Sequence, residues 1–392
     1  MNHSHFDYVI VGNGLAGLQL ALKLASDSYF DGVKIALIDP LSKTKNDKTW
    51  SFWEKHSTPW DNLTEKEWPQ ASFITKSKEI SLNLHPYRYK TIRSIDFYKF
   101  SRSVLSQKSN VMFITDTVTS IQETIDLVQI TTKSETYTSA HVFDSRVPDS
   151  FNNLENKSIR LTQHFKGYVI DVSSNVFNDN NLVMMDYRLK DGGQTTFMYV
   201  LPFSKRKALI EFTYFTEQLV EESVYDTFIK TYIKDYLKID KYHITETETG
   251  QIPMSTFRFE KFNTSKITKI GTGGGWVKAS TGYSFKHTEK KVTQIINNIK
   301  LNRIPSFKLF KSKYKFYDKV FLKVLKDENS KGEWVFQQLY SKNSIQSIFR
   351  FLDEESTLID ELKIMWSLLS WRFLKAFFKT LLVIYPVVLV RY

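Results

Sequence analysis

The sequence predicts an α/β fold, and three segments near its N-terminus support this prediction. Residues 6–11 form an apolar run typical of a short buried strand, and the turn Gly12-Asn13-Gly14-Leu15-Ala16-Gly17 follows it. Residues 15–26 then place apolar side chains at helical spacing, and a second apolar run over 33–38 ends at Asp39. This order of strand, turn, helix and strand is typical of the Rossmann type of fold, which binds a dinucleotide.

The glycine-rich turn has residue types suited to contact with the phosphates of a dinucleotide. Gly12 permits the tight turn, Gly14 lets the backbone approach a pyrophosphate, and Gly17 lets the helix pack closely on the strand. The helix begins here, and its free N–H groups and positive dipole end attract phosphate. The predicted contacts in this turn are Gly12, Gly14, Leu15, Ala16 and Gly17.

Two further segments favour FAD over NAD as the dinucleotide. Residues 142–144 form a short apolar strand that ends in an acid, as in the late strand that closes a flavoprotein sheet. Flexible backbone from Gly271 to Gly282 precedes a helix and is placed to contact the flavin and the pyrophosphate. The carboxylate of Asp39, 25 positions after Gly14, is expected to accept hydrogen bonds from the adenosine ribose. The predicted cofactor residues outside the turn are Asp39, Gly271, Thr281, Gly282 and Tyr283.

Composition narrows the possible chemistry of the chain. The 392 residues include no cysteine, which excludes disulfides, thiol nucleophiles and thiolate metal sites, and the eight histidines show no metal-ligand spacing. Aromatic residues make up 15%, which indicates either an aromatic-rich core or an apolar cavity for a long hydrophobic ligand. The net charge of +12 predicts an anionic partner, and we expect lipid and not nucleic acid because no nucleic-acid-binding module is present.

The rest of the chain predicts a second sheet and a helical C-terminal part. Residues 111–143 alternate in short β-like runs, which predicts a small antiparallel layer packed on the main sheet. A second sheet with its own helix is expected to bind the substrate, with strands over 165–170, 182–185, 195–201 and 208–213 and a helix over 217–236. We therefore expect an FAD-binding domain at 1–150, a substrate domain of mixed β-sheet at 151–262, the last part of the FAD-binding domain at 263–300, and a helical C-terminal cap at 301–392.

Several motifs resemble those of one known family, the bacterial lycopene β-cyclases. Asn46 to Phe52 is similar to their N-x-x-T-W-S-F segment, and Ser280 to Ser284 is similar to their S/T-T-G-Y-S segment. The other similar segments, which follow the family order, are Tyr199–Phe203, Ala208–Thr213, Glu248 with a predicted turn at Gly250–Met254, Phe351–Ser356 and Glu361–Met365. The chain departs from the family at two positions: Ala279 stands where a proline is usual, and Phe212 stands where plant relatives have a second acid.

This resemblance implies a reaction, a cofactor and an acid. Lycopene β-cyclases convert the acyclic ends of lycopene to β-ionone rings, giving γ-carotene and β-carotene, by protonation of a double bond, ring closure and loss of a proton. The resemblance implies that Glu211 is the acid, and its apolar surroundings suit a carboxyl group that must stay protonated. It also implies FAD in its reduced form, with NAD(P)H as the reductant. Either Glu211 or Glu248 is the base, although a structural salt bridge is the alternative role for Glu248.

The C-terminal segment is apolar and rich in aromatics. Arg372, Lys375 and Lys379 interrupt it on one helical face, and Pro386 interrupts its last apolar run. Three charges near the middle disfavour a transmembrane helix. Two interpretations are then open: an interfacial helix with its cations toward lipid phosphates, or an amphipathic helix docked on the protein core. With the first, the protein is a peripheral enzyme on the cytoplasmic face of the membrane.

Two other functions are compatible with the same scaffold. The first is an FAD-dependent redox enzyme, such as a monooxygenase or an isoprenoid reductase, which would consume NAD(P)H in proportion to product. The second is a non-catalytic, membrane-associated carrier of carotenoid or flavin, for which Glu211 would be irrelevant.

Overall fold

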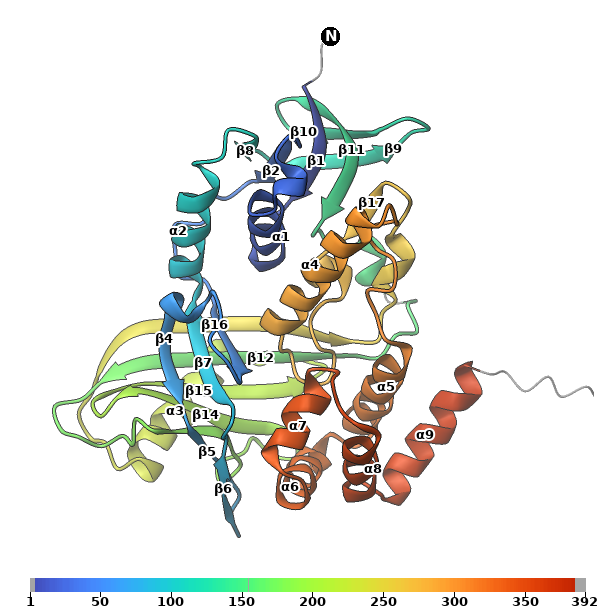
Figure 1. Cartoon of the computed structure of the whole chain (residues 1–392). Helices are drawn as coiled ribbons and strands as arrows, with labels where there is room; N and C mark the ends of the chain where they lie inside the picture. Colours follow the sequence, from blue (N-terminus) through green and yellow to red (C-terminus); the bar gives the residue numbers. More distant parts are fainter. Residues whose placement is uncertain (1–3, 154, 385–392) are drawn as a thin grey trace, which may run out of the picture.

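The computed structural model describes residues 4–153 and 155–384 (Figure 1). The predicted N-terminal unit is present as β1 (His5–Val11), α1 (Leu15–Ala25) and β2 (Ile35–Asp39). β1 pairs in parallel with β2, and every residue of β2 is buried. Such continuous burial explains why β2 appears as an apolar run in the sequence and not as an alternating pattern.

The first sheet contains seven strands in the order β8-β2-β1-β11-β10-β9, with β17 paired to β11. The prediction of a separate antiparallel layer over 111–143 was wrong. β8 (Val111–Thr115) pairs in parallel with β2, and β11 (Thr136–Asp144) pairs in parallel with both β1 and β17 (Ile267–Lys269). Only β9 (Val118–Glu123) and β10 (Val128–Thr132) add antiparallel pairs. All of these strands therefore belong to one sheet, and the last four residues of β11 are buried within it.

The second sheet also contains seven strands, in the order β16-β12-β15-β14-β13-β5-β6. α3 (Glu222–Thr231), extended by a π-helical turn over Tyr232–Tyr236, packs on one face of this sheet. The turn predicted at Gly250–Met254 was wrong, because this segment lies inside the 13-residue strand β16. β16 is an edge strand, where a proline and a glycine are tolerated. The other strands are β12 (Arg160–Asp171), β15 (Lys207–Thr216), β14 (Thr196–Ser204), β13 (Asn181–Asp186), β5 (Gln70–Ile74), β6 (Glu79–Asn83) and β16 (His243–Ser255).

The predicted domain boundary at residue 150 does not separate the two sheets. β5 lies far before this boundary but pairs in parallel with β13 of the second sheet. The chain crosses between the sheets through a three-stranded sheet of β3 (Thr49–Glu54), β4 (Thr64–Trp68) and β7 (Arg88–Arg93), and returns through α2 (Ser94–Leu105). Later, β17 and α4 (Phe285–Lys300) return to the first sheet, and α4 packs with α1 (Figure 1).

The C-terminal part is helical and covers the second sheet on the face opposite α3. It comprises α5 (Ser312–Asp327), α6 (Gly332–Lys342), α7 (Ile345–Leu352), α8 (Leu358–Ser367) and α9 (Trp371–Ile384). Pro386 lies outside the described residues. α9 runs alongside α5 (Figure 1), and its Arg372 donates a hydrogen bond to Glu328. Arg372, one of the three cations on this helix, is therefore engaged by an acid just after α5.

Candidate active site

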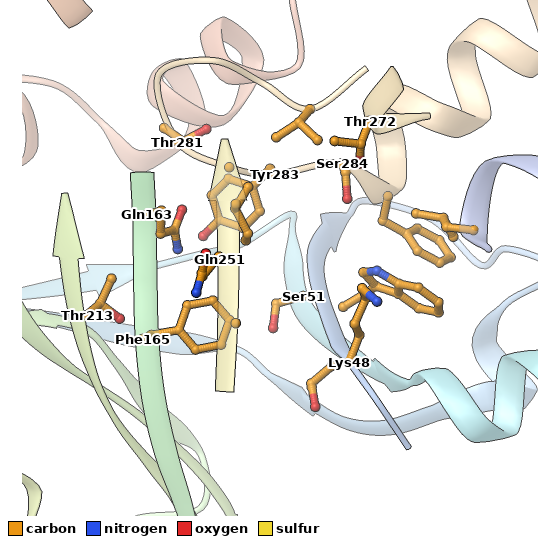
Figure 2. Close-up of a pocket in the computed structure, with 18 of the residues that line it drawn as sticks. Lys48, Ser51, Gln163, Phe165, Thr213, Gln251, Thr272, Thr281, Tyr283 and Ser284 are labelled. Atoms are coloured by element: carbon orange, nitrogen blue, oxygen red, sulfur yellow. The ribbon is translucent and has the colours of Figure 1, made fainter. Parts of the chain in front are cut away.

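One cavity of about 590 Å³ connects the glycine-rich turn to the second sheet. Figure 2 shows its labelled side chains converging from three parts of the chain. Lys48 and Ser51 come from the segment around β3, Gln163, Phe165 and Thr213 from the second sheet, and Thr272, Thr281, Tyr283 and Ser284 from the loop before α4. The cavity therefore has two ends of different construction, one at the turn and one on the sheet.

The glycine-rich turn leaves no room for side chains where it meets the protein, and leaves open space where it meets the cavity. A Cβ on Gly12 would lie 2.0 Å from the Ser145 hydroxyl, and a Cβ on Gly17 would lie 2.0 Å from the carbonyl oxygen of Gly12. A Cβ on Gly14 would contact nothing within 4 Å. Leu15 and Ala16 begin α1 without a side-chain cap, so its first N–H groups are available to an anionic ligand.

Asp39 holds this turn in place. Its carboxylate accepts hydrogen bonds from the backbone N–H groups of Asn13 at 2.7 Å and Leu41 at 2.8 Å, and Lys43 lies 3.7 Å away. Asp39 is buried and is not part of the cavity wall. Its contact with an adenosine ribose stays a prediction, while its support of the turn is direct.

The loop before α4 forms the opposite wall near the turn. Gly271 (φ +58°) and Gly282 (φ +77°) have left-handed backbone, and a Cβ on Gly282 would lie 2.2 Å from the Gln163 side chain. The loop is closed by its own backbone, because the N–H of Gly282 and the carbonyl of Tyr283 both bond to Lys278 at 2.8 Å. Ala279, which replaces the usual proline, therefore leaves a closed turn.

Three buried polar atoms on the cavity wall have no hydrogen-bond partner among the residues that the structure describes: the side-chain oxygens of Gln163 and Thr281 and the indole nitrogen of Trp276. Buried polar groups are rarely left unpaired in folded proteins. These atoms, the open space at Gly14 and the free helix end all suit a polar ligand that runs from the glycine-rich turn along the loop. The residues present therefore fit the predicted dinucleotide.

At the sheet end, four residues form a row across adjacent strands. Tyr199 on β14 pairs with Glu211 on β15, Glu211 pairs with Gly167 on β12, and Gly167 pairs with Glu248 on β16. Directly paired residues point to the same face of a sheet, which here is the cavity face. Phe212 points to the other face and stacks on Phe228 with ring centroids 4.4 Å apart. The departure from the family at position 212 thus lies outside the cavity.

Glu211 has the environment that an acid catalyst requires. Its side chain is buried, and the Thr213 hydroxyl donates a hydrogen bond to it at 2.6 Å. Burial raises the pKa of Glu211 to about 8, and the nearby charge of Glu248 acts in the same direction. At neutral pH this carboxyl group is therefore mostly protonated.

Glu248 is held by Thr49, which lies in the segment that resembles N-x-x-T-W-S-F. Its carboxylate accepts hydrogen bonds from the Thr49 backbone N–H at 3.1 Å and from the Thr49 hydroxyl at 2.8 Å. The alternative role of Glu248 in a salt bridge was wrong, since no cation among the described residues pairs with it. Burial raises the pKa of Glu248, and the two Thr49 donors oppose this effect.

A cluster of tyrosine hydroxyls completes the wall beside Glu211. The Tyr89 hydroxyl lies 2.9 Å from those of both Tyr199 and Tyr283, and Tyr199 donates to Ser51 at 3.1 Å. Burial raises the pKa of all three tyrosines well above the usual value, so they stay neutral. Sequence motifs include Tyr199 and Tyr283, whereas Tyr89 carries no sequence signal and only the fold brings it to the site.

Several solved structures share this fold at low sequence identity. A geranylgeranyl bacteriochlorophyll reductase-like protein from Thermoplasma acidophilum is 13% identical, with a TM-score of 0.60 and coverage of 98% of each chain. A flavin-dependent brominase is 12% identical, with a TM-score of 0.61 over 89% of this chain and 94% of the other. The halogenase PltM, in complex with phloroglucinol and FAD, is 11% identical, with a TM-score of 0.57 over 95% of this chain and 90% of the other. These likenesses confirm the predicted fold class, an α/β fold of the Rossmann-type FAD-binding kind.

A search of curated protein sequences gave no match. A sequence model of the family described as lycopene cyclase protein matches residues 7–381, which is nearly the whole chain. The chain therefore belongs to the lycopene cyclase protein family.

Proposed function

We propose that the protein is a lycopene β-cyclase that uses bound FAD and closes the ends of lycopene to β-ionone rings, giving γ-carotene and β-carotene. One observation supports this most strongly. A buried, protonated carboxyl group, Glu211, shares one cavity with the glycine-rich turn and the loop before α4, which are suited to bind a dinucleotide. The cavity wall around this group carries several aromatic side chains, which suit an apolar substrate.

In the proposed reaction, Glu211 donates its proton to the terminal double bond of lycopene. The neighbouring double bond attacks the resulting cation, a C–C bond forms, and a ring proton leaves. One proton is added and one is removed, so substrate and product are isomers. The rings of Phe165, Tyr199 and Tyr283 line the cavity and can stabilise positive charge through their faces. Because the tyrosines are neutral, they contribute without quenching the cation.

FAD is the dinucleotide that we assign to the glycine-rich turn and the loop before α4. The N–H groups at the start of α1 would hold its pyrophosphate, and the loop from Gly271 to Tyr283 would hold its flavin side. When bound in its reduced form, with NAD(P)H as the reductant, FAD would supply an electron-rich ring system to the cavity without net electron transfer. The protein's own part is to bind it and to exclude water from the cavity.

The direct test is a pigment profile from a bacterium that accumulates lycopene and expresses either the wild type or Glu211→Gln. The wild type should give cyclic carotenoids, and the variant should leave lycopene unchanged, a loss of at least about 10²-fold. Purified Glu211→Gln should retain its flavin absorbance, which separates a lost proton donor from a lost fold. If both proteins loaded with flavin but neither converted lycopene, the proposal would fail and a redox function would replace it.

We further propose that the enzyme takes its substrate from a membrane through α8 and α9. Among the described residues, no helix has the length and apolar character needed to cross a bilayer. Instead, these helices form an apolar surface, on which Trp366 and Trp371 are 76% and 77% exposed. Its other exposed members are Leu358, Ile359, Leu362, Met365, Leu369, Leu374, Phe377 and Phe378. The exposed cations Lys363, Lys375 and Lys379 lie on the same two helices. Apolar and cationic groups together suit an anionic bilayer surface, which we place at the cytoplasmic face of the membrane.

Co-sedimentation with vesicles that mix neutral and anionic phospholipids tests this surface. The double variant Trp366→Ser/Trp371→Ser should lose most of its vesicle binding at an unchanged melting temperature. The matched control is Ile125→Ser, which removes an apolar residue of 94% exposure far from α8 and α9 in the first sheet's β9–β10 turn. Equal binding of wild type and double variant would contradict the assignment.

A further inference from the structure

Two carboxyl groups stand on the same wall of the cavity. Glu211 and Glu248 occupy one row of the second sheet, with Gly167 on the strand between them. Neighbouring strands lie about 4.8 Å apart, so the two backbones are roughly 10 Å apart and both side chains point to the same face. Both glutamates line the cavity, so one substrate end can lie against the two groups together.

Gly167 keeps the space between the two glutamates open. A Cβ at this position would lie 2.8 Å from a methyl carbon of Leu209 and 3.2 Å from the Cβ of Glu211. Gly167 is not among the glycines with left-handed backbone, so its conformation does not require glycine. The small residue is therefore needed for space, and the space it provides lies between the two carboxyl groups.

The two carboxyl groups have different hydrogen-bond environments. Glu211 accepts one hydrogen bond, from a neighbour on its own strand. Glu248 accepts two, from the backbone and hydroxyl of Thr49, and donors of this kind favour an ionised carboxylate. Burial raises the pKa of both groups, but the two Thr49 donors oppose this effect at Glu248, and such a difference in surroundings is typical of an acid and a base that work together.

Other groups on the cavity wall are poorly suited to remove a proton. The three clustered tyrosines are neutral, because burial raises their pKa well above the usual value. Asp47 is engaged by Lys48, Ser94 and Tyr98. The described part of the wall contains no histidine. Glu248 is therefore the ionisable group best placed to act beside Glu211.

We propose that Glu248 is the base that removes the ring proton, while Glu211 serves as the acid, and that the position of Glu248 selects the ring type. This inference rests on the proposed cyclase function. The proton of Glu211 passes to the terminal double bond, the ring closes, and a ring C–H proton passes to the Glu248 carboxylate. The double bond of the product forms from that C–H electron pair. Transfer of the proton from Glu248 to Glu211 then restores the starting state.

The choice of proton determines the product. The same cyclic cation gives a β, ε or γ ring according to which neighbouring carbon loses its proton. A base held by two hydrogen bonds to Thr49 has a fixed position and would favour one of these protons, whereas loss of that base would leave the choice to weaker acceptors such as water.

The test compares pigments made by wild type, Glu211→Gln and Glu248→Gln in a bacterium that accumulates lycopene. We expect β rings from the wild type and no cyclic product from Glu211→Gln. For Glu248→Gln we expect at least about tenfold less total cyclic product, with ε or γ rings appearing among it. Unchanged ring type in Glu248→Gln, at any level of product, would overturn the inference while leaving the cyclase function intact. Absence of cyclic product from the wild type would instead reject the cyclase function.

A second variant keeps the inference testable if Glu248→Gln does not fold. Thr49→Val removes the hydroxyl donor but keeps the backbone donor, so the pKa of Glu248 should rise. The charged groups around Glu248 are Glu211 in its row, Glu246 with its partner Arg93, and Asp47 with its partner Lys48, and Thr49→Val alters none of them. The acid limb of the pH–rate profile should therefore move to higher pH in Thr49→Val, while the alkaline limb stays. An acid limb that does not move would contradict the role of Glu248 as base.

Discussion

The two ends of the cavity are built in different ways. The end at the glycine-rich turn is made mostly of backbone, from residues that are adjacent in sequence and from one later loop. The end at the second sheet is made of side chains. The pairing register of β14, β15, β12 and β16 brings these side chains together. The end at the turn depends on the space that glycines leave by having no side chain. The end at the sheet depends on which side chains the strand register aligns.

This difference indicates how each end should respond to substitution. At the turn, a methyl group added to a glycine should weaken folding where protein atoms lie close to it, and should weaken cofactor binding where it enters the cavity. On the sheet, removing a single proton donor should affect the reaction and leave binding intact. Single substitutions at the two ends of the cavity test this division.

The largest effect should come from Gly17→Ala. The new Cβ would lie 2.0 Å from the carbonyl oxygen of Gly12, so α1 must move away from the turn. We expect a loss of about 1–3 kcal/mol in the free energy of unfolding, as for other overpacked sites, together with loss of bound flavin. Chemical denaturation and flavin absorbance measure the two effects.

Gly14→Ala is the matched variant for the same end. Its Cβ would contact no protein atom within 4 Å, so the flavin-free protein should melt at the wild-type temperature. Flavin affinity should nevertheless fall, because the methyl group would occupy the space that a pyrophosphate needs. Full flavin loading of Gly14→Ala would show that the cofactor does not approach the turn closely. The turn would then not be the cofactor-binding end of the cavity.

At the sheet end, the reaction should depend on the protonation of Glu211. Its pKa is raised to about 8, so the acid is loaded below this pH and is lost as the pH rises through it. We expect kcat/KM to fall about tenfold per pH unit above roughly pH 8, while flavin binding at the other end changes little over the same range. An alkaline limb near the ordinary pKa of a glutamic acid would contradict the assignment.

The smallest effect should come from Thr213→Val, which removes the hydroxyl that donates to Glu211 at 2.6 Å. That donor lowers the pKa of Glu211, so its loss should move the alkaline limb to higher pH by less than about one unit. The acid limb should stay, which is the reverse of the result expected for Thr49→Val. A shift of both limbs in either variant would show that the two carboxyl groups titrate as one coupled pair.

The two ends of the cavity also differ in how far the sequence predicts them. The glycine-rich turn was predictable because its motif and its function occupy the same few residues. Glu211 was predicted through family resemblance, and its pairing with Tyr199 became visible only with the strand register. Glycine and proline in β16 were interpreted as a turn because they usually signal one, although an edge strand tolerates both.

The parts that could not be predicted depend on contacts between distant segments. The hydrogen bond between Thr49 and Glu248 joins residues 199 positions apart, and nothing local to either residue indicates it. Likewise, β5 joins the second sheet across the predicted domain boundary because it pairs with β13. Periodicity identifies strands one at a time, but it does not determine which strands become neighbours.

We propose that this cavity performs proton chemistry and not net electron transfer. The most direct measurement counts both products of the reaction, using purified flavin-loaded protein, lycopene in vesicles and NADH. We expect a cyclic carotenoid with the same mass as lycopene, and NADH consumption far below the amount of product. A product that differs from lycopene in mass by added or lost hydrogens or oxygen, formed with one NADH consumed per molecule, would contradict this proposal.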